Sequence, residues 1–203
     1  MVDYWSIPVA ILIILLASSF MLARLLRRHT VGRERFGVWE WSINRRFARG
    51  PVGPVVLEGL DDIQQPLRSL EHFKSRDDQI SIYKLHSISE HDTVRTWHIL
   101  VRSLDGFSTP IALRPAGASS SLIDLMNLQL FPRLSSEVRF AVYGLRATDA
   151  RALANGPARA LLPPDIGLIR GADQLILDFT SRPFDPVEFN RMLAVADQVK
   201  AVV

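Results

Sequence analysis

Cysteine is absent from the 203 residues of the chain. Its absence excludes disulfide bonds, iron–sulfur clusters held by cysteine, cysteine nucleophiles and zinc sites with thiolate ligands. A chain of this length does not depend on disulfides, because a domain of roughly 150 residues buries about 70% of the surface that its unfolded chain exposes. The phosphate-binding patterns Gly-x-Gly-x-x-Gly and Gly-x-x-x-x-Gly-Lys-Ser/Thr are absent as well. The sequence therefore gives no support for nucleotide binding.

Excess positive charge is missing from most of the chain and is concentrated in one stretch. The net charge is +3. Residues 24–49 hold eight arginines against Glu34 and Glu40, a net of +6, whereas residues 1–23 contribute −1 and residues 50–203 contribute −2. The region that we expect to fold is therefore not basic, unlike a typical nucleic-acid-binding domain. We expect no nucleic-acid partner.

Charged side chains are also missing from residues 4–23, an uncharged run of 20 residues with an aliphatic centre. A helix of that length spans about 30 Å, which matches the hydrocarbon core of a bilayer. The alternative is a cleaved signal peptide. It fits poorly because Asp3, and no Lys or Arg, precedes the run, and because no small-residue cleavage site lies before the arginines. We predict an uncleaved, single-pass transmembrane anchor over residues 1–26.

The residues beside the predicted anchor indicate its interfaces and its direction. Aromatic residues favour the membrane–water interface, and arginines favour the cytoplasmic side of a membrane span. The N-terminus is therefore predicted to lie outside the cell membrane and the C-terminal domain to lie in the cytoplasm. The predicted membrane-interface residues are Tyr4, Trp5, Arg24, Arg27, Arg28, Arg33 and Arg35.

Residues 27–54 are predicted to form an arginine-rich juxtamembrane connector, because glycines and prolines there interrupt any long helix. Its arginines are expected to contact anionic lipid headgroups, each contributing about 1 kcal/mol. Aromatic residues between the arginines fit the same interface. For residues 39–43 the alternative is a first strand that enters the core of the domain.

Small residues lie on one face of the predicted anchor, at Ser6, Ala10 and Ala17. Small side chains allow two helix backbones to approach closely in a bilayer, so this face is predicted to dock on a helix of a larger integral membrane protein or complex. The alternative explanation is that alanine and serine are ordinary residues of membrane helices. A second small pair, Ser19 and Ala23, has four-residue spacing.

Residues 55–203 are predicted to form one α+β domain with a mostly antiparallel sheet and helices packed against it. Alternation of apolar and polar residues indicates strands, as at Trp97, Ile99 and Val101. Strands and helices that do not alternate regularly favour an antiparallel sheet over a parallel one. Strands are predicted over residues 55–58, 79–88, 93–104, 110–114, 137–144, 166–170 and 173–180, the second and third forming a hairpin.

The last helix has the clearest beginning of the three predicted helices. Asp185 is predicted to cap it, Pro186 to take its first position, and Glu188 to complete a capping box. Phe184 and Phe189 occupy the positions of a hydrophobic staple, and apolar residues then repeat at helical spacing.

Two further helices are predicted in the second half of the chain. One begins after the cap residue Ser121, with Leu122, Leu125, Met126 and Leu128 facing inward, and ends before residue 132. The other covers residues 148–155 and ends at Gly156.

Candidate catalytic and metal-binding residues are few. His86, Glu90, His91 and His98 have the wrong spacing for a zinc protease and fall in the predicted hairpin rather than on a helix. Ser119, Ser120 and Ser121 follow a glycine but lack the pattern of a nucleophile elbow, and the adjacent aspartates 61–62 and 77–78 are typical of turns or caps. We therefore expect no enzyme activity, no metal and no cofactor.

These observations favour a membrane-anchored, non-catalytic accessory or structural subunit. It would dock on a larger integral membrane complex for transport, respiration or photosynthesis and stabilise or assemble that complex. Phe107, in the loop 104–110, is a predicted partner contact. The alternative is a membrane-tethered domain that binds a lipid or small ligand between sheet and helices. A third possibility, an anchored hydrolase that uses the serines or histidines, has the least support.

Overall fold

The computed structural model describes residues 46–57, 66–88, 94–105, 109–131, 139–171 and 173–203. The chain divides into two compact units, Met1–Arg45 and Arg46–Val203. The described residues all belong to the second unit. None of the helices within the described ranges combines the length and the apolar character needed to cross a bilayer. The predicted anchor, at residues 1–26, lies outside these ranges and stays a prediction.

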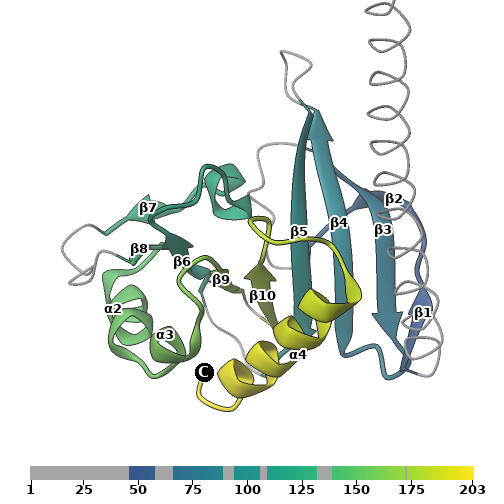
Figure 1. Cartoon of the computed structure of the whole chain (residues 1–203). Coiled ribbons are helices and arrows are strands. Elements are labelled where there is room, and N and C mark those ends of the chain that lie inside the picture. The colour runs from purple at the N-terminus through teal and green to yellow at the C-terminus, as the bar shows by residue number, and fades with distance from the viewer. Residues whose placement is uncertain (1–45, 58–65, 89–93, 106–108, 132–138, 172) are drawn as a thin grey trace, which may run out of the picture. The chain divides into compact units, whose positions relative to one another are not determined.

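A ten-stranded antiparallel sheet forms the framework of the described domain (Figure 1). Its strand order is β1-β3-β4-β5-β10-β9-β6-β8-β7, and β2 pairs with β3. The strands are β1 Phe47–Arg49, β2 Gly53–Val55, β3 Leu67–Ser75, β4 Ile80–Ile88, β5 Val94–Ser103, β6 Ile111–Pro115, β7 Gln129–Leu130, β8 Phe140–Gly144, β9 Gly167–Arg170 and β10 Gln174–Asp178. The prediction of a mostly antiparallel sheet with helices is confirmed.

The long hairpin at the centre of the sheet was predicted correctly. β4 and β5 pair from Ile80 opposite Arg102 to Ile88 opposite Val94. β10 then pairs with the other edge of β5, so a strand from the end of the chain lies beside one from its middle. β5 is consequently a central strand, which explains why Leu100 is as fully buried as its neighbours Ile99 and Trp97.

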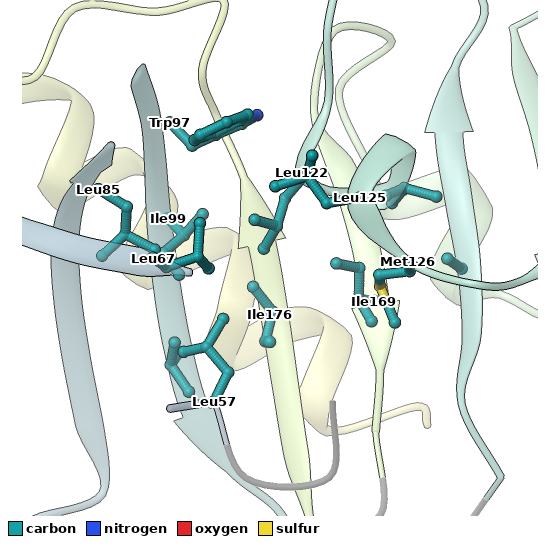
Figure 2. Packing of buried hydrophobic residues seen from close by; sticks show 13 residues of the cluster. Leu57, Leu67, Leu85, Trp97, Ile99, Leu122, Leu125, Met126, Ile169 and Ile176 are labelled. Atoms are coloured by element: carbon teal, nitrogen blue, oxygen red, sulfur yellow. The ribbon is translucent and has the colours of Figure 1, made fainter. Parts of the chain in front are cut away.

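One face of the sheet is covered by a short 3₁₀ helix, η1, at Leu122–Leu125. Figure 2 shows side chains of η1 on the same side of the sheet as side chains from β4, β5, β9 and β10. The core on this face includes Leu85, Trp97, Ile99, Leu122, Ile123, Leu125, Ile169 and Ile176.

The opposite face is covered by three helices, α2 Ala147–Asn155, α3 Ala158–Leu161 and α4 Pro186–Lys200. In Figure 1, α4 lies against β5 and β10, while α2 and α3 lie together at the end of the sheet that holds β6 and β8. Both faces are therefore buried, which accounts for the nearly continuous apolar runs of the central strands.

Two short strands make the domain begin earlier than the predicted boundary at residue 55. β1 pairs with the end of β3, and β2 pairs with its beginning. The part of the predicted connector from Phe47 to Pro54 therefore belongs to the sheet edge. Both strands have only three residues, and only Phe47 of them is buried, so their sequence lacks the alternation that marks a longer strand.

The helix predicted after Ser121 is a single 3₁₀ turn instead. Met126 has an extended backbone, with φ −93 and ψ 144, and Gln129–Leu130 pairs with β8 as strand β7. Leu122 and Ile123 are both buried although they are adjacent. That burial suits a tight turn pressed on a sheet rather than one apolar stripe along a helix.

Helices α2 and α4 match their predictions closely. Asp185 accepts hydrogen bonds from the backbone N–H groups of Val187 (2.9 Å) and Glu188 (3.0 Å), as a helix cap should. The Phe184 and Phe189 rings are 4.6 Å apart, which confirms the staple. The predicted capping box is wrong, because the carboxylate of Glu188 accepts hydrogen bonds from two arginines instead.

Candidate functional site

A hollow of about 610 Å³ opens on the helix-covered face, where α2 and α3 meet the beginning of β6 and the end of β9. This volume falls within the range of small-molecule sites, about 300 to 1,000 Å³. Its lining combines charged, polar and apolar side chains. The described lining residues are Thr109, Ile111, Arg146, Asp149, Ala152, Leu153, Gly156, Pro157, Ala158, Arg170, Val202 and Val203.

Close packing of α2 on the sheet sets one wall of the hollow. A side chain at Gly144 of β8 would place its Cβ 3.1 Å from Ile111 and 3.6 Å from Ala150, so the absence of a side chain lets the helix approach. Asp149 and Leu153 are four residues apart on α2, and both line the hollow.

Asp149 is held by a hydroxyl group at the edge of the hollow. Thr109 donates a hydrogen bond to its Oδ2, and Thr148 donates to its Oδ1 at 3.2 Å. The Thr109 bond is the main reason that the pKa of Asp149 lies below its ordinary value, and the positive charges of Arg146 and Arg170 lower it further. Asp149 is therefore ionised at neutral pH.

Two arginines give the hollow a positive balance. Arg170 is the last residue of β9, and its Nε is buried without a hydrogen-bond partner among the described residues. Arg146 is the exposed N-cap residue of α2, and its side chain makes no capping hydrogen bond. Among the side chains of the described lining, two cations thus stand against one carboxylate.

The described lining offers groups that can hold a ligand, namely the guanidinium groups of Arg146 and Arg170 and the hydroxyl group of Thr109. None of the lining residues named above is a histidine, a serine or a lysine. Thr109 donates its hydroxyl hydrogen to Asp149, whose lowered pKa makes it a weak base.

A second polar cluster, around Asp178, lies on the opposite face of the sheet. Asp178 is 3% exposed and accepts hydrogen bonds from Ser121 Oγ (2.6 Å) and from the backbone N–H of Leu122 (2.7 Å). Thr180 donates to its other oxygen. Ser121 also completes a capping box with Asp124, which confirms its predicted role as a cap.

An ion-pair network ties the beginning of α4 to the loop before β9. Arg182 donates to both carboxylate oxygens of Asp165 at 2.7 Å, and to Glu188 at 3.0 Å. These bonds to Arg182 are the main reason that the pKa of Asp165 lies below its ordinary value. Arg191 donates to the other oxygen of Glu188 at 2.6 Å. The network links loop and helix.

Two of the histidines that the sequence groups together lie on the central hairpin, His86 on β4 opposite Thr96 and His98 on β5 opposite Lys84. His98 Nδ1 lies 2.9 Å from the carbonyl oxygen of Arg182, and its ring packs beside Phe179 and Phe184. Burial lowers the pKa of His98, so the ring is neutral at pH 7. Glu90 and His91 lie outside the described residues. In the part of the chain that the structure describes, no three His, Asp or Glu side chains are grouped so that they could hold a metal ion.

The site residues predicted from the sequence lie outside the described ranges. This applies to the membrane-interface residues Tyr4, Trp5, Arg24, Arg27, Arg28, Arg33 and Arg35, to the docking residues Ser6, Ala10 and Ala17, and to Phe107. A ligand site between sheet and helices was the alternative in the sequence analysis, but none of the residues that line the hollow was predicted. The sequence shows Arg146 just before a predicted helix and Arg170 at the end of a predicted strand. Their proximity could not be predicted, because it depends on the order of the strands in the sheet.

Comparisons with known proteins identify a similar fold. No family model matches the chain, and no curated protein matches it. The crystal structure of the mycobacterial trehalose monomycolate transport factor A, TtfA, is similar with a TM-score of 0.52. The match covers 84% of this chain and 92% of that one, at 11% sequence identity. At this identity the two proteins share a fold.

Proposed function

We propose that this chain is a non-catalytic accessory subunit of a membrane transport system, anchored beside a larger integral membrane protein. The observation that carries the proposal is the uncharged run of residues 4–23, followed directly by the arginine-rich stretch 24–49. That order of apolar and positive segments is typical of a single-pass helix whose following domain lies in the cytoplasm.

The similar fold favours transport over the other membrane complexes that the sequence leaves open. TtfA is named as a transport factor, and the fold likeness extends over most of both chains. Respiratory and photosynthetic complexes have no comparable support. Because a fold does not determine a function, the role in transport is part of the proposal.

The described domain has features that suit a scaffold. The central strands of its sheet are buried on both faces, and its buried polar groups at Ser121 and Asp178 bond to each other. In this proposal the predicted docking face, Ser6, Ala10 and Ala17, contacts the partner helix, and the arginines of the connector contact anionic lipid headgroups.

Purification in a mild detergent tests this proposal. The full chain, with an affinity tag after Val203, is extracted from its native membranes and separated by size under native conditions. We expect it to migrate with an integral membrane transport protein in a constant ratio. The control is the same tag on an unrelated single-pass protein of similar abundance. Migration of the chain alone, under conditions that keep other membrane complexes intact, would contradict the proposal.

A further inference from the structure

We propose that the hollow between α2, α3, β6 and β9 binds a small anionic amphiphile, a phosphate or carboxylate group joined to a short apolar chain. This inference goes beyond the accessory role and does not depend on it. It rests on the charges, the unpaired donor and the apolar lining of the hollow.

The positive side chains point to the anionic group. Arg170 is a β9 residue in the wall, and its buried Nε has no acceptor within the described part of the chain. A buried donor without an acceptor is destabilising, so an anionic ligand that accepts from it recovers stability. Guanidinium groups also match the planar geometry of phosphate and carboxylate oxygens.

The beginning of α2 adds to this attraction. Arg146 stands at the N-cap of α2, where the helix dipole is positive, and its side chain makes no capping hydrogen bond. Asp149 cancels one of the two positive charges, but its carboxylate is already occupied by Thr109 and Thr148. The lining side chains thus keep one net positive charge, which suits one anionic group.

The rest of the lining points to an apolar chain on the ligand. Ile111, Leu153 and Ala158 are almost fully buried residues that line the hollow. The side chain of Ala152 is small, which leaves space in the hollow. A short alkyl chain buried here would lose contact with water, which favours binding.

Titration calorimetry of the full chain in phosphatidylcholine nanodiscs tests the proposal with three probes: hexyl phosphate, inorganic phosphate and hexanol. We expect hexyl phosphate to bind at least tenfold more tightly than either of the other two. Equal affinity for hexyl phosphate and inorganic phosphate would overturn the assignment, since the apolar lining would then contribute nothing.

Two sets of variants locate the binding. Arg146→Gln with Arg170→Gln should weaken hexyl phosphate binding at least tenfold, because two charged donors are lost. The matched control is Arg151→Gln, on the same helix but outside the lining, which should change the affinity less than twofold. Unchanged binding in the double variant would overturn the proposal.

A filling variant keeps the test decisive if the arginine variant folds poorly. Ala152→Trp places a large side chain in the hollow from an exposed position, and Ala160→Trp makes the same change on α3 outside the lining. We expect Ala152→Trp to abolish hexyl phosphate binding and Ala160→Trp to retain it. Retained binding in Ala152→Trp would overturn the proposal.

A final experiment distinguishes a membrane lipid from a soluble molecule as the ligand. Nanodiscs that contain phosphatidic acid offer the anionic group from the membrane. A lower apparent affinity for hexyl phosphate in these nanodiscs supports a membrane lipid as the ligand, and an unchanged affinity supports a soluble alkyl phosphate or carboxylate. Both results keep the proposed chemistry, and neither depends on whether a partner protein co-purifies.

Discussion

The buried carboxylate of Asp178 stabilises the packing of η1 on the sheet. It lies at the end of β10 and accepts hydrogen bonds from Ser121, Leu122 and Thr180. Gly167 of β9 lies opposite it in the sheet, and a Cβ there would be 3.2 Å from that of Asp178 and 3.5 Å from Ser121 Oγ. The missing side chain thus leaves room for the cluster that attaches η1 to the sheet.

Replacing Asp178 with Ala should destabilise the domain by about 2 to 4 kcal/mol, because it leaves the buried donors of Ser121 and Leu122 without an acceptor. Urea unfolding of the full chain in detergent micelles, followed by near-ultraviolet circular dichroism, measures the change. The control is Asp173→Ala at an exposed aspartate five residues away, with an expected change within about 0.5 kcal/mol. A loss below about 1 kcal/mol for Asp178→Ala would contradict this account.

The pair formed by Asp165 and Arg182 predicts a defined dependence on pH. Since the pKa of Asp165 is lower in the folded state than its ordinary value of 3.8, the pair contributes stability above that value and loses it as the pH falls through the folded pKa. Asp165 is 41% exposed, so the contribution is at most about 1 kcal/mol.

Asp165→Asn should therefore be less stable than the natural chain at pH 7, and the difference should shrink below about pH 4. Urea unfolding of both chains at pH 7, 5 and 3 measures it. A difference that stays constant over this range would show that the charge of Asp165 contributes nothing.

At the scale of elements, α4 shows which features can be predicted from sequence. Its cap, its first proline and its staple are local, so Asp185, Pro186, Phe184 and Phe189 identify them directly. The capping box failed for a tertiary reason. Arg182 and Arg191 form ion pairs with the carboxylate of Glu188, and the local sequence does not predict these pairs.

The missed strand β3 and the shortened helix at η1 have related causes. β3 carries a bulge between Ser69 and Glu71, which shifts its alternation of buried and exposed residues halfway along. η1 is anchored by Asp178, 56 positions beyond Leu122 in the sequence. Both features depend on partners that only the completed sheet provides, as does the meeting of Arg146 with Arg170 in the hollow.

The cap of α4 gives a prediction at this scale. Asp185→Ala should cost about 1 kcal/mol, because the N–H groups of Val187 and Glu188 lose their acceptor, whereas Asp185→Ser should cost much less since serine also caps helices. Urea unfolding of the three chains compares them. An equal loss for Ala and Ser would show that the charge of Asp185, rather than its hydrogen bonds, stabilises the helix.

The whole molecule combines a folded domain of known architecture with a predicted membrane anchor. The fold is shared with a transport factor, and the positive charge lies next to the uncharged run rather than on the domain. In the proposed function, the anchor helix docks on a larger membrane protein through the small residues Ser6, Ala10 and Ala17.

Enlarging the small residues of the anchor tests that claim most directly. Ala10→Leu with Ala17→Leu keeps the run apolar, so membrane insertion should persist while close helix contact is lost. The matched control is Ser19→Leu with Ala23→Leu, which enlarges two residues on the opposite side of a helix with 3.6 residues per turn.

The measurement is the amount of partner that co-purifies with each tagged full chain, at equal amounts of chain in the membrane. The account predicts at least a tenfold loss of partner for the Ala10 and Ala17 variant and near-natural recovery for the Ser19 and Ala23 control. Full recovery of the partner with the Ala10 and Ala17 variant would contradict it.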